Sequence, residues 1–302
     1  MKTKKRINQD TPAEKFFLFL TGLVLVIFAI CCVYPFWYVL IYSLSSADKV
    51  REGLSFLPKG FTLENYRKVF ELKQIYHAIM ISGLRAVIGT IVTLFCTSML
   101  AYIVSKPQFK ARKFIFRMMV FTMYVGGGLI PYILTMRAYH LDNTFLLYII
   151  PSAFGAYNAI LIKTYIEQLP AGLEESAMLD GANYFQIFIK IVIPLCVPVL
   201  AAVAVFTAVG QWNSWTDNFY LVRDPNLQCL QLILMNYLKQ SEAVVKALQQ
   251  GFSYDEIKNM VQISPMTIRM TVTVVSVVPI FCVYPFMQKY FVKGLLLGAI
   301  KG

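Results

Sequence analysis

Residues 166–194 read IEQLPAGLEESAMLDGANYFQIFIKIVIP. Pro170 suits the first turn of a helix, where its missing N–H is not needed. The apolar residues Leu173, Ala177 and Met178 follow at helical spacing and give this helix one apolar side. A segment that is amphipathic in this way packs one face against the protein, so we expect it to be more than a passive connector.

The second half of the stretch predicts a bend and another helix. Asp180 followed by Gly181 is a turn signal, because glycine allows backbone angles that other residues avoid. Asn183 followed by Gln186 is typical of a capping box that opens a helix. The sequence therefore predicts two short helices joined by a bend over residues 166–190.

The composition around this stretch is that of a membrane protein. Hydrophobic residues make up 58% of the 302 and charged residues 15%, and the mean hydropathy is +0.60. Soluble domains carry about 25% charged residues. A net charge of +12 admits a nucleic-acid-binding patch as an alternative, but basic inner loops of a membrane protein explain the same balance.

Six apolar segments are long enough to cross a bilayer, for which about 20 residues are needed. We therefore expect an all-α integral membrane fold with six transmembrane helices and no separate soluble domain. The predicted spans are residues 16–44, 76–104, 114–136, 143–165, 191–212 and 266–288. The run from Gly126 to Gly128, with Pro131, would loosen the third span or else serve close helix packing.

Basic residues orient the spans. The short loop KPQFKARK (106–113) is the strongest signal, because short cytoplasmic loops are enriched in Lys and Arg. With this loop inside, the terminal tails 1–15 and 289–302 are both cytoplasmic, as is the loop 166–190. The loop 213–265 is then outside.

Several classes of protein are disfavoured by the residues that carry chemistry. All 16 acidic residues fall outside the predicted spans, whereas ion-coupled carriers usually keep a carboxylate inside the membrane. The chain has no GxxxxGK[ST] phosphate loop, no HExxH helix and no CxxC pair among its six cysteines. Nucleotide binding, a membrane-embedded enzyme and a metal site are therefore not indicated. If the protein moves a solute uphill, another chain supplies the energy.

The loop at 166–190 resembles the EAA loop of bacterial ABC importer permeases. That pattern is roughly EAAxxDGA, followed by IxLP with nine residues between the glycine and the isoleucine. The corresponding residues here are Glu175-Ser176-Ala177, Asp180-Gly181-Ala182 and Ile191-Val192-Ile193-Pro194. Ser176 stands for an alanine and Ile193 for a leucine, and both changes are small.

The resemblance extends over the whole chain. It includes FLPKGFTLENYRKVF (56–70), TSMLAYIVSK (97–106), GQWNSW (210–215) and YFVKGLLLGAIKG (290–302). The chain is most similar to the carbohydrate-uptake, maltose-type subfamily, and within it to the LplC/YtcP type of oligosaccharide permease. This implies a type I importer permease in a bacterial plasma membrane, with neither catalytic residues nor a cofactor of its own.

The same resemblance implies partners. They are a second, distinct permease subunit, two ATPase subunits that hold ATP and Mg²⁺, and an external sugar-binding protein. A permease for another small solute and a secondary transporter remain the alternatives.

In that family the EAA loop is a coupling helix that inserts into a cleft of the ATPase subunit. The resemblance implies this role for Glu174, Glu175, Ser176, Ala177, Asp180, Gly181 and Ala182. Gly181 suits a sharp bend, and the carboxylates could face basic residues of the partner. An ordinary solvated loop with a turn is the alternative.

Residues at the outer end of the fifth span are candidates for a sugar path, because aromatic faces and hydrogen-bonding side chains both hold sugars. The candidates are Gln211, Trp212, Asn213, Trp215, Asp217 and Tyr220, together with Arg85 in the second span. An interfacial aromatic belt is the alternative for the Trp and Tyr residues. Arg85 either faces protein or a water-filled cavity, or extends outward to the interface.

Two further segments carry expectations. Leu230 to Leu238 form an apolar stripe at helical spacing, and Ser253 with Glu256 makes another capping box. We therefore expect residues 213–265 to be helical, and either to dock the binding protein or to cover the bundle. The tail from Lys293 to Gly302 either reaches between the ATPases or frays.

Overall fold

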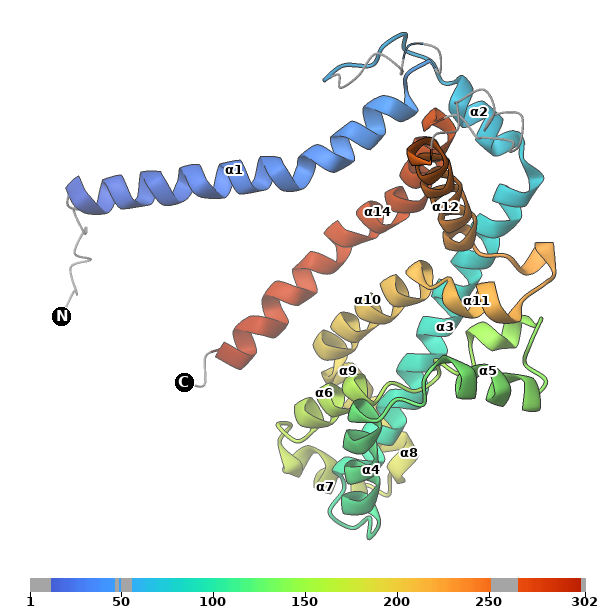
Figure 1. Ribbon diagram of the computed structural model, residues 1–302. Coiled ribbons are helices and arrows are strands. Elements are labelled where there is room, and N and C mark those ends of the chain that lie inside the picture. The colour runs from blue at the N-terminus through green and yellow to red at the C-terminus, as the bar shows by residue number, and fades with distance from the viewer. Residues whose placement is uncertain (1–11, 47–48, 50–55, 251–265, 300–302) are drawn as a thin grey trace. The chain divides into compact units, whose positions relative to one another are not determined.

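The chain is helical throughout most of the part that the structure describes. The computed structural model describes residues 12–46, 49, 56–250 and 266–299 (Figure 1). Within these ranges the only paired extended residues are Ser45 and Phe61, which form one isolated bridge. The all-α fold expected from the sequence is therefore confirmed for the described residues.

The α-helices are α1 (Pro12–Ser43), α2 (Glu64–Glu71), α3 (Lys73–Ser105), α4 (Arg112–Tyr124), α5 (Leu129–Ala138), α6 (Ala156–Ile166), α7 (Ala171–Leu179), α8 (Tyr184–Ile187), α9 (Ile193–Leu195), α10 (Val197–Asn213), α11 (Thr216–Leu221), α12 (Leu230–Gln249) and α14 (Met266–Ala299). Shorter helical turns are η2 (Phe145–Tyr148), η3 (Phe188–Val192) and η4 (Pro225–Leu227). The chain divides into two compact units, one of residues 1–69 and 264–274 and the other of residues 70–263 and 275–302.

In the first unit, a side chain at the beginning of α2 forms hydrogen bonds with carbonyls at the end of α1. The Asn65 side chain is buried and donates to the carbonyl oxygens of Ser43 and Ser45 at 2.9 and 2.8 Å. Carbonyls at a helix C-terminus have no N–H of their own helix to pair with. Thr62 Oγ1 accepts from the Glu64 N–H at 3.1 Å, which caps α2. Side-chain hydrogen bonds therefore satisfy two carbonyls at the end of α1 and one N–H at the start of α2.

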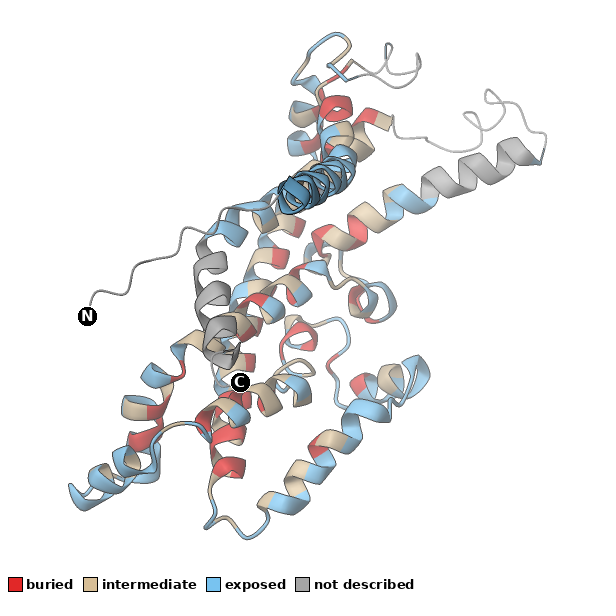
Figure 2. Ribbon diagram, turned by 90° about the vertical axis from the view of Figure 1, so that its left-hand side faces the viewer, coloured by how far each residue is buried: buried red, intermediate tan, exposed pale blue. Residues whose placement is uncertain are grey.

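The helix α1 has the character of a membrane span. Most of its residues are exposed apolar side chains, and Figure 2 shows it, seen nearly end on, in the pale blue of exposed residues. A helix that is apolar on all sides is stable when lipid or other apolar helices surround it. Its length and composition also satisfy the requirement for crossing a bilayer.

The second unit is built around α3. The helices α10, α6 and α4 all pack against it (Figure 1). Its buried positions include the small residues Gly89, Thr93, Thr97, Ser98 and Ala101. Small residues let neighbouring helices approach closely in a membrane. The hydroxyl groups of the threonines and serine also form hydrogen bonds with backbone groups. Thr93 Oγ1, for example, is a donor 2.7 Å from the Ser152 carbonyl oxygen.

The count of six transmembrane helices is not confirmed by the described residues. Three helices are long and apolar enough to cross a bilayer, namely Pro12–Ser43, Lys73–Ser105 and Met266–Pro285. A fourth is added if the bent pair Tyr184–Leu195 and Val197–Asn213 forms one span. The first, second and sixth predicted spans therefore correspond to long helices.

The third predicted span, 114–136, is not one continuous helix. It is divided between α4, which ends at Tyr124, and α5, which begins at Leu129. The intervening residues include three consecutive glycines, of which Gly128 adopts φ +78°. This backbone angle is outside the right-handed helical range, and glycine reaches it without strain. The break therefore follows from the glycines, although the segment is apolar apart from Arg117.

The fourth predicted span, 143–165, is also interrupted. Only η2 and α6 are helical in it, and Pro151 and Gly155 lie in the irregular stretch between them. Proline cannot donate a backbone hydrogen bond, and glycine has low helix propensity. Hydropathy alone does not register either effect.

The fifth predicted span, 191–212, is bent. The part that ends at Leu195 and the part that begins at Val197 make an angle of 82°. Pro194 cannot donate to a carbonyl in the preceding turn, and η3 is a π-helical turn directly before it. The bend separates the predicted coupling loop from the apolar helix α10.

The remaining expectations concern the helices α12 and α14 and the segments next to them. The helix predicted from the stripe at Leu230 to Leu238 is present as α12. The helix α14 continues past the predicted boundary at residue 288 as far as Ala299. The capping box of Ser253 and Glu256 lies outside the described residues, as do the tips of both terminal tails.

Candidate functional site

The sequence DGA at 180–182 ends α7 in a Schellman motif. Gly181 adopts φ +85°. Its N–H donates to the Met178 carbonyl at 3.0 Å, and the N–H of Ala182 donates to the Ala177 carbonyl at 2.9 Å. These two bonds satisfy carbonyls that the end of a helix otherwise leaves unpaired. A Cβ added at Gly181 would meet no atom within 4 Å, so glycine is required here for its backbone angle rather than for space.

Asn183 then opens α8 in the predicted capping box. Its Oδ1 accepts from the Gln186 N–H at 2.9 Å, and Gln186 Oε1 accepts from the Asn183 N–H at 3.0 Å. This reciprocal pair satisfies two donors at the start of the helix. Both short helices predicted in 166–190 are therefore present, and the bend between them is hydrogen-bonded on each side.

An apolar cluster fixes this segment to the rest of the second unit. Ile187 and Phe188 are buried together with Tyr102 of α3 and with Ile162 and Ile166 of α6. The ring centroids of Phe188 and Tyr102 are 5.4 Å apart. Because packed interiors deform little, a displacement of the segment must either move α3 and α6 with it or disrupt this cluster.

An ion pair provides a second attachment. Lys106, at the C-terminal end of α3, pairs with both carboxylate oxygens of Glu174 in the first turn of α7. The two side chains are only 15% and 17% exposed, and Lys106 Nζ lies 4.2 Å from the centre of the Tyr102 ring. A cation at a helix C-terminus and an anion near an N-terminus both suit the helix dipoles. Glu174, expected to offer its charge to a partner, is therefore engaged within the chain.

The candidate coupling residues divide between an inner and an outer face. Ala177 and Ala182 pack against the apolar cluster, on the side where Glu174 is ion-paired. The exposed members are Glu175, Ser176, Asp180 and Gly181. Beside them, the apolar side chains of Leu179 and Phe185 are 89% and 60% exposed. Large exposed apolar groups among polar residues are typical of a surface that binds another protein.

The second group of candidates meets around Arg85 of α3, which is 3% exposed. Its Nη1 and Nη2 lie 3.1 and 2.5 Å from the two carboxylate oxygens of Asp217, and its Nε donates to Gln211 Oε1 at 2.9 Å. Nη1 also lies 3.3 Å from the Ser214 carbonyl oxygen. The guanidinium carbon is 4.6 Å from the centre of the Tyr148 ring. Arg85 is therefore enclosed by protein partners and does not extend outward to the interface.

This ion pair shows that one carboxylate outside the predicted spans is nevertheless enclosed by protein. Asp217 belongs to the predicted outer loop 213–265, yet its side chain is only 11% exposed. The helix α10 ends at Asn213, and α11 turns so that Asp217 meets Arg85. A charge in low-dielectric surroundings needs a partner, and each of these two supplies one for the other. Both carboxylate oxygens are used, so Asp217 serves as a counter-ion.

Gln211 links the ion pair to the packing of the helices. It is buried, and its Nε2 is within hydrogen-bond distance of Ser152 Oγ while its Oε1 accepts from Arg85. It also lies directly against Gly89 of α3, where an added Cβ would meet Gln211 Nε2 at 2.7 Å and Cδ at 2.9 Å. Glycine at this position therefore leaves room for the amide.

Two members of this network, Tyr148 and Ser152, were not expected from the sequence. Tyr148 donates from its hydroxyl to the Leu227 carbonyl at 2.7 Å and accepts from Asn218 Nδ2 at 2.6 Å. A tyrosine in an apolar run and a serine after a proline look like ordinary span residues. The packing of helices from distant parts of the chain is what gives them polar partners.

Two of the candidates for the sugar path, Trp212 and Asn213, have hydrogen-bond partners outside the network around Arg85. Trp212 is buried and donates from Nε1 to the Ser276 carbonyl at 2.9 Å, which joins α10 to α14 within the second unit. Asn213 Oδ1 accepts from Gln231 Nε2 at 3.0 Å. Neither residue contacts the Arg85 ion pair through these bonds.

The last two candidates, Trp215 and Tyr220, lie near a small cavity and a lysine. Lys239 Nζ lies 5.3 Å from the centre of the Trp215 ring. A cavity of about 200 Å³ is lined by Tyr220 with Asp217, Leu129, Tyr132, Ser214 and Thr216. Ligand sites are commonly about 300–1,000 Å³, so this cavity is too small to be a complete oligosaccharide site.

The two sites consist of ion pairs, hydrogen bonds and packed apolar groups. In the ranges that the structure describes, no three His, Cys, Asp or Glu side chains gather closely enough to hold a metal ion. The segment from α7 to α8 has an exposed face for a partner and an inner face attached to α3 and α6. The arrangement can therefore receive a displacement at one end and pass it to helices of the membrane domain.

Comparison with known proteins places these features in context. The family described as "Binding-protein-dependent transport system inner membrane component" matches residues 94–297. The polygalacturonan/rhamnogalacturonan transport system permease protein YtcP of Bacillus subtilis is 36% identical over 282 residues, which cover 92% of this chain and 96% of YtcP. Protein LplC of the same organism is 34% identical over 269 residues, which cover 89% of each chain.

A solved structure is also similar over nearly the whole chain. It is described as a bacterial ABC transporter involved in the import of the acidic polysaccharide alginate. The TM-score is 0.82 and the sequence identity 29%, and the match covers 93% of this chain and 99% of that one.

Proposed function

The chain belongs to the family of binding-protein-dependent transport system inner membrane components, and from this membership we propose that it is a permease subunit of an ATP-driven carbohydrate importer. An oligosaccharide is the substrate class we favour. YtcP is described as transporting polygalacturonan and rhamnogalacturonan, and the similar solved structure as importing alginate. Permeation of another small solute is the alternative.

The coupling segment, defined as residues 171–190, carries this proposal. Its exposed face combines Glu175 and Asp180 with large apolar side chains, and we propose that it inserts into a cleft of a partner ATPase. Its backbone is held in a defined bend by the Schellman motif at Gly181 and the capping box at Asn183. A pre-formed bend loses little conformational entropy when it docks.

We propose that the partner ATPases bind ATP and Mg²⁺ and carry out hydrolysis. Support comes from the sequence of this chain, which has no phosphate loop of the GxxxxGK[ST] type. The chain itself would perform no chemistry. It would convert closure of the ATPases into a movement of its helices.

The proposed mechanism is alternating access. Closure of the ATPases would displace the coupling segment, and the Lys106–Glu174 pair with the cluster around Phe188 would carry that displacement to α3 and α6. Further along α3, the ion pair of Arg85 with Asp217 would carry it to α11. The translocation cavity of the assembled importer would then open outward and receive sugar from an external binding protein. Hydrolysis of ATP would return the importer to the inward-open state.

The chain is a multi-pass membrane protein, and we propose that both of its termini are cytoplasmic. The basic loop 106–113 supports this orientation, since short inner loops are enriched in Lys and Arg. The bacterial plasma membrane is the proposed location. A second, distinct permease subunit would complete the pore, and the outer region around α12 is a candidate contact for the binding protein.

The test is uptake of labelled oligosaccharides by cells that express the chain with its partner subunits. ATP and the ion gradients are controlled separately. We expect ATP depletion to abolish uptake while the gradients are intact, and collapse of the gradients to leave uptake in place while ATP is retained. The opposite pattern would identify a secondary transporter. Uptake of a different small solute, with none of any oligosaccharide, would favour the alternative permease.

A further inference from the structure

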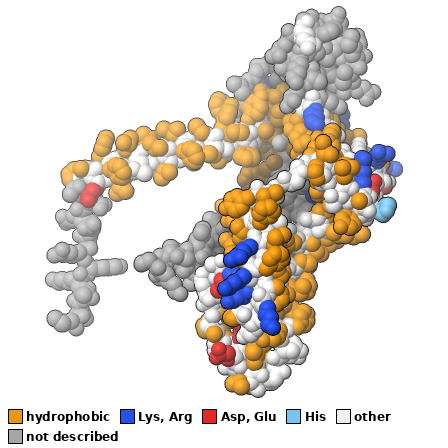
Figure 3. All heavy atoms as spheres, turned by 60° about the horizontal axis from the view of Figure 1, so that its bottom comes forward, with side chains coloured by type: hydrophobic (Ala, Val, Ile, Leu, Met, Phe, Trp, Pro, Cys, Tyr) orange, Lys and Arg blue, Asp and Glu red, His pale blue; other side chains and the backbone are white. Residues whose placement is uncertain are grey.

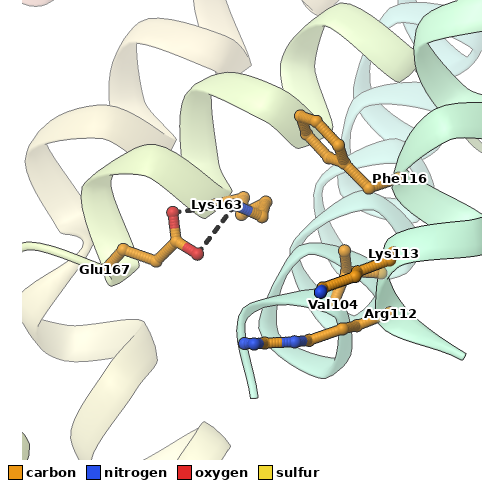
Figure 4. Close-up of a pocket in the computed structure, with 6 residues that line it drawn as sticks. All are labelled: Val104, Arg112, Lys113, Phe116, Lys163 and Glu167. Atoms are coloured by element: carbon orange, nitrogen blue, oxygen red, sulfur yellow. Dashed lines mark hydrogen bonds and ion pairs between the residues drawn. The ribbon is translucent and has the colours of Figure 1, made fainter. Parts of the chain in front are cut away.

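A basic pocket lies between α4 and α6, outside both sites described above. Its volume is about 260 Å³, and it is lined by Val104, Arg112, Lys113, Phe116, Lys163 and Glu167 (Figure 4). Three of these six side chains are basic and one is acidic. The proposed transport mechanism assigns this pocket no role.

The acidic residue of the pocket is already paired. Glu167 accepts from Lys163 Nζ through both oxygens at 2.7 Å, one helical turn away on α6. Lys163 Nζ is also 4.9 Å from the centre of the Phe116 ring. The single carboxylate of the pocket therefore compensates Lys163 and leaves two positive charges in excess.

Those two charges belong to Arg112 and Lys113 at the start of α4. In Figure 4 both side chains extend from α4 toward the side on which Lys163 lies. Among the residues that the structure describes, neither takes part in an ion pair. They also lie in the first turn of a helix of 13 residues whose N-cap, Ala111, makes no side-chain hydrogen bond. Cations are unfavourable at a helix N-terminus, so an anion in the pocket would relieve this arrangement.

Apolar side chains surround this basic group. On α4, Phe114 is 67% exposed and Phe121 is 57% exposed. Figure 3 shows Lys and Arg side chains gathered on the near end of the molecule, with apolar side chains along both sides of them. An anion that meets both surfaces would carry a charged head and an apolar body. A soluble anion would use only the basic part.

We propose that this pocket binds the phosphate of an anionic phospholipid headgroup in the inner leaflet. Arg112 and Lys113 provide the charge, and the guanidinium can bind phosphate oxygens in a bidentate manner. Basic pockets between helices on the cytoplasmic side of a membrane protein suit such headgroups. The assignment to the inner leaflet depends on the orientation given under the proposed function. The pocket and its excess of positive charge do not depend on it.

The lipid would brace α4 against α6. The helix α6 leads directly into the coupling segment, since it ends at Ile166 and α7 begins at Ala171. The two helices already meet through apolar packing around Met119 and Ala159 and through Lys163, which lies over the Phe116 ring. A phosphate bound by Arg112 or Lys113 close to Lys163 would add a charged bridge between α4 and α6.

The experiment measures lipid retention by the full transporter complex purified in detergent. Native mass spectrometry counts bound phosphatidylglycerol after titration, with phosphatidylcholine as the zwitterionic comparison and inorganic phosphate as a soluble competitor. The test variant is the double substitution Arg112→Gln and Lys113→Gln. The matched control is Lys110→Gln and Arg117→Gln, which also removes one lysine and one arginine from exposed positions nearby.

We expect the pocket variant to bind phosphatidylglycerol about tenfold or more weakly than the parent chain, because each basic residue near the membrane surface contributes to headgroup binding. The control should change binding much less. A variant that keeps both charges, Arg112→Lys with Lys113→Arg, should retain the lipid, which separates loss of the site from misfolding.

Equal losses in the pocket variant and the control would overturn the proposal, because they would show diffuse surface attraction. Displacement of phosphatidylglycerol by millimolar inorganic phosphate would also overturn it, because the site would then be one for a soluble anion. The readout is lipid binding, so a complex that imports sugar without pocket-dependent retention would remove this inference and leave the proposed function intact.

Discussion

Arg85 and Asp217, which are 132 positions apart in the sequence, face each other as a two-point ion pair at 3.1 and 2.5 Å. Their side chains are 4% and 11% exposed. Burial of two charges is costly unless each is well paired and hydrogen-bonded. The additional bond from Arg85 Nε to Gln211 satisfies a further donor of the guanidinium. The pair therefore fixes α11 to α3 and makes each partner dependent on the other.

The first prediction concerns removal of one partner. Asp217→Asn leaves the Arg85 charge buried without its counter-ion, so the free energy of unfolding should fall by about 3–5 kcal/mol. The double substitution Arg85→Met with Asp217→Leu removes both charges and should recover most of this loss. Thermal unfolding of the purified complex, followed by intrinsic fluorescence, measures both. The prediction is contradicted if the double variant loses as much free energy of unfolding as its two single substitutions lose in sum.

The second prediction concerns the space beneath Gln211. Gly89→Ala places a methyl group only 2.7 and 2.9 Å from Gln211 Nε2 and Cδ, which is closer than van der Waals contact allows. The flexible amide should move away and lose its bond to Arg85, at a cost of about 1.5–3 kcal/mol for a hydrogen bond to a charged group. Gly83→Ala is the control, because a Cβ at Gly83 on the same helix meets nothing within 4 Å. Equal unfolding temperatures for the two variants would contradict this account.

The third prediction concerns the attachment of the coupling segment. Glu174→Gln should weaken the docking of α7 on α3 by about 1.5–3 kcal/mol, the value for a charge-assisted hydrogen bond. Sugar uptake should fall while ATP hydrolysis by the complex continues. The exchanged pair Lys106→Glu with Glu174→Lys restores an ion pair and should recover part of the uptake. Uptake per ATP hydrolysed, measured in proteoliposomes, is the informative ratio.

Glu175→Gln is the matched control for that experiment. Glu175 is exposed, so its substitution should not loosen α7 from α3, although it could weaken contact with the ATPase. Protease cleavage within residues 166–170 separates the two effects. It should become faster for Glu174→Gln and remain unchanged for Glu175→Gln.

The fourth prediction concerns the backbone at Gly181. Because φ is +85° and a Cβ would meet no neighbour, the cost of a substitution depends on backbone strain. Gly181→Val should lose about 1–3 kcal/mol from the bend and uncouple ATP hydrolysis from uptake. Gly181→Asn should retain far more coupling, because asparagine tolerates the left-handed region. Equal uptake by the two variants would show that the bend is not needed.

The fifth prediction concerns the thiol of Cys229, which precedes α12. Burial raises the pKa of this thiol, so at any given pH a smaller fraction is thiolate than for an exposed cysteine. Labelling by a charged maleimide should therefore be slow near neutral pH and should rise only at higher pH. The comparison is Arg223→Cys at an exposed position, each thiol being present alone in an otherwise cysteine-free chain. Labelling of Cys229 as fast as that of the introduced cysteine would contradict its burial.

Local features of this chain could be predicted from its sequence because they depend on interactions between residues that are close in the sequence. The bend at Asp180 and Gly181 and the capping box of Asn183 and Gln186 are both present in the structure. Each involves hydrogen bonds among residues within one or two turns. Hydropathy likewise located α3, because the length of an apolar helix is a property of one continuous segment.

Helix interruptions were only partly visible in the sequence. The glycines that divide α4 from α5 could be read as a flexible point or as a packing surface, and both readings fit an apolar segment. The 82° bend between α9 and α10 follows from Pro194 together with a π-helical turn. Whether a proline kinks a helix or ends it depends on the neighbours that can receive the two parts.

Pairing between distant residues was beyond any local pattern. Lys106 could face several acids of the coupling segment, and it is the fold that selects Glu174. Asp217 read as a residue of an outer loop, and only the fold brings it to Arg85 of α3 as a counter-ion. Apolar length, caps and turns depend on a few neighbouring residues and follow from the order of the amino acids. The partner of a buried charge depends on which helices come together, and that is settled by the packing of the whole second unit.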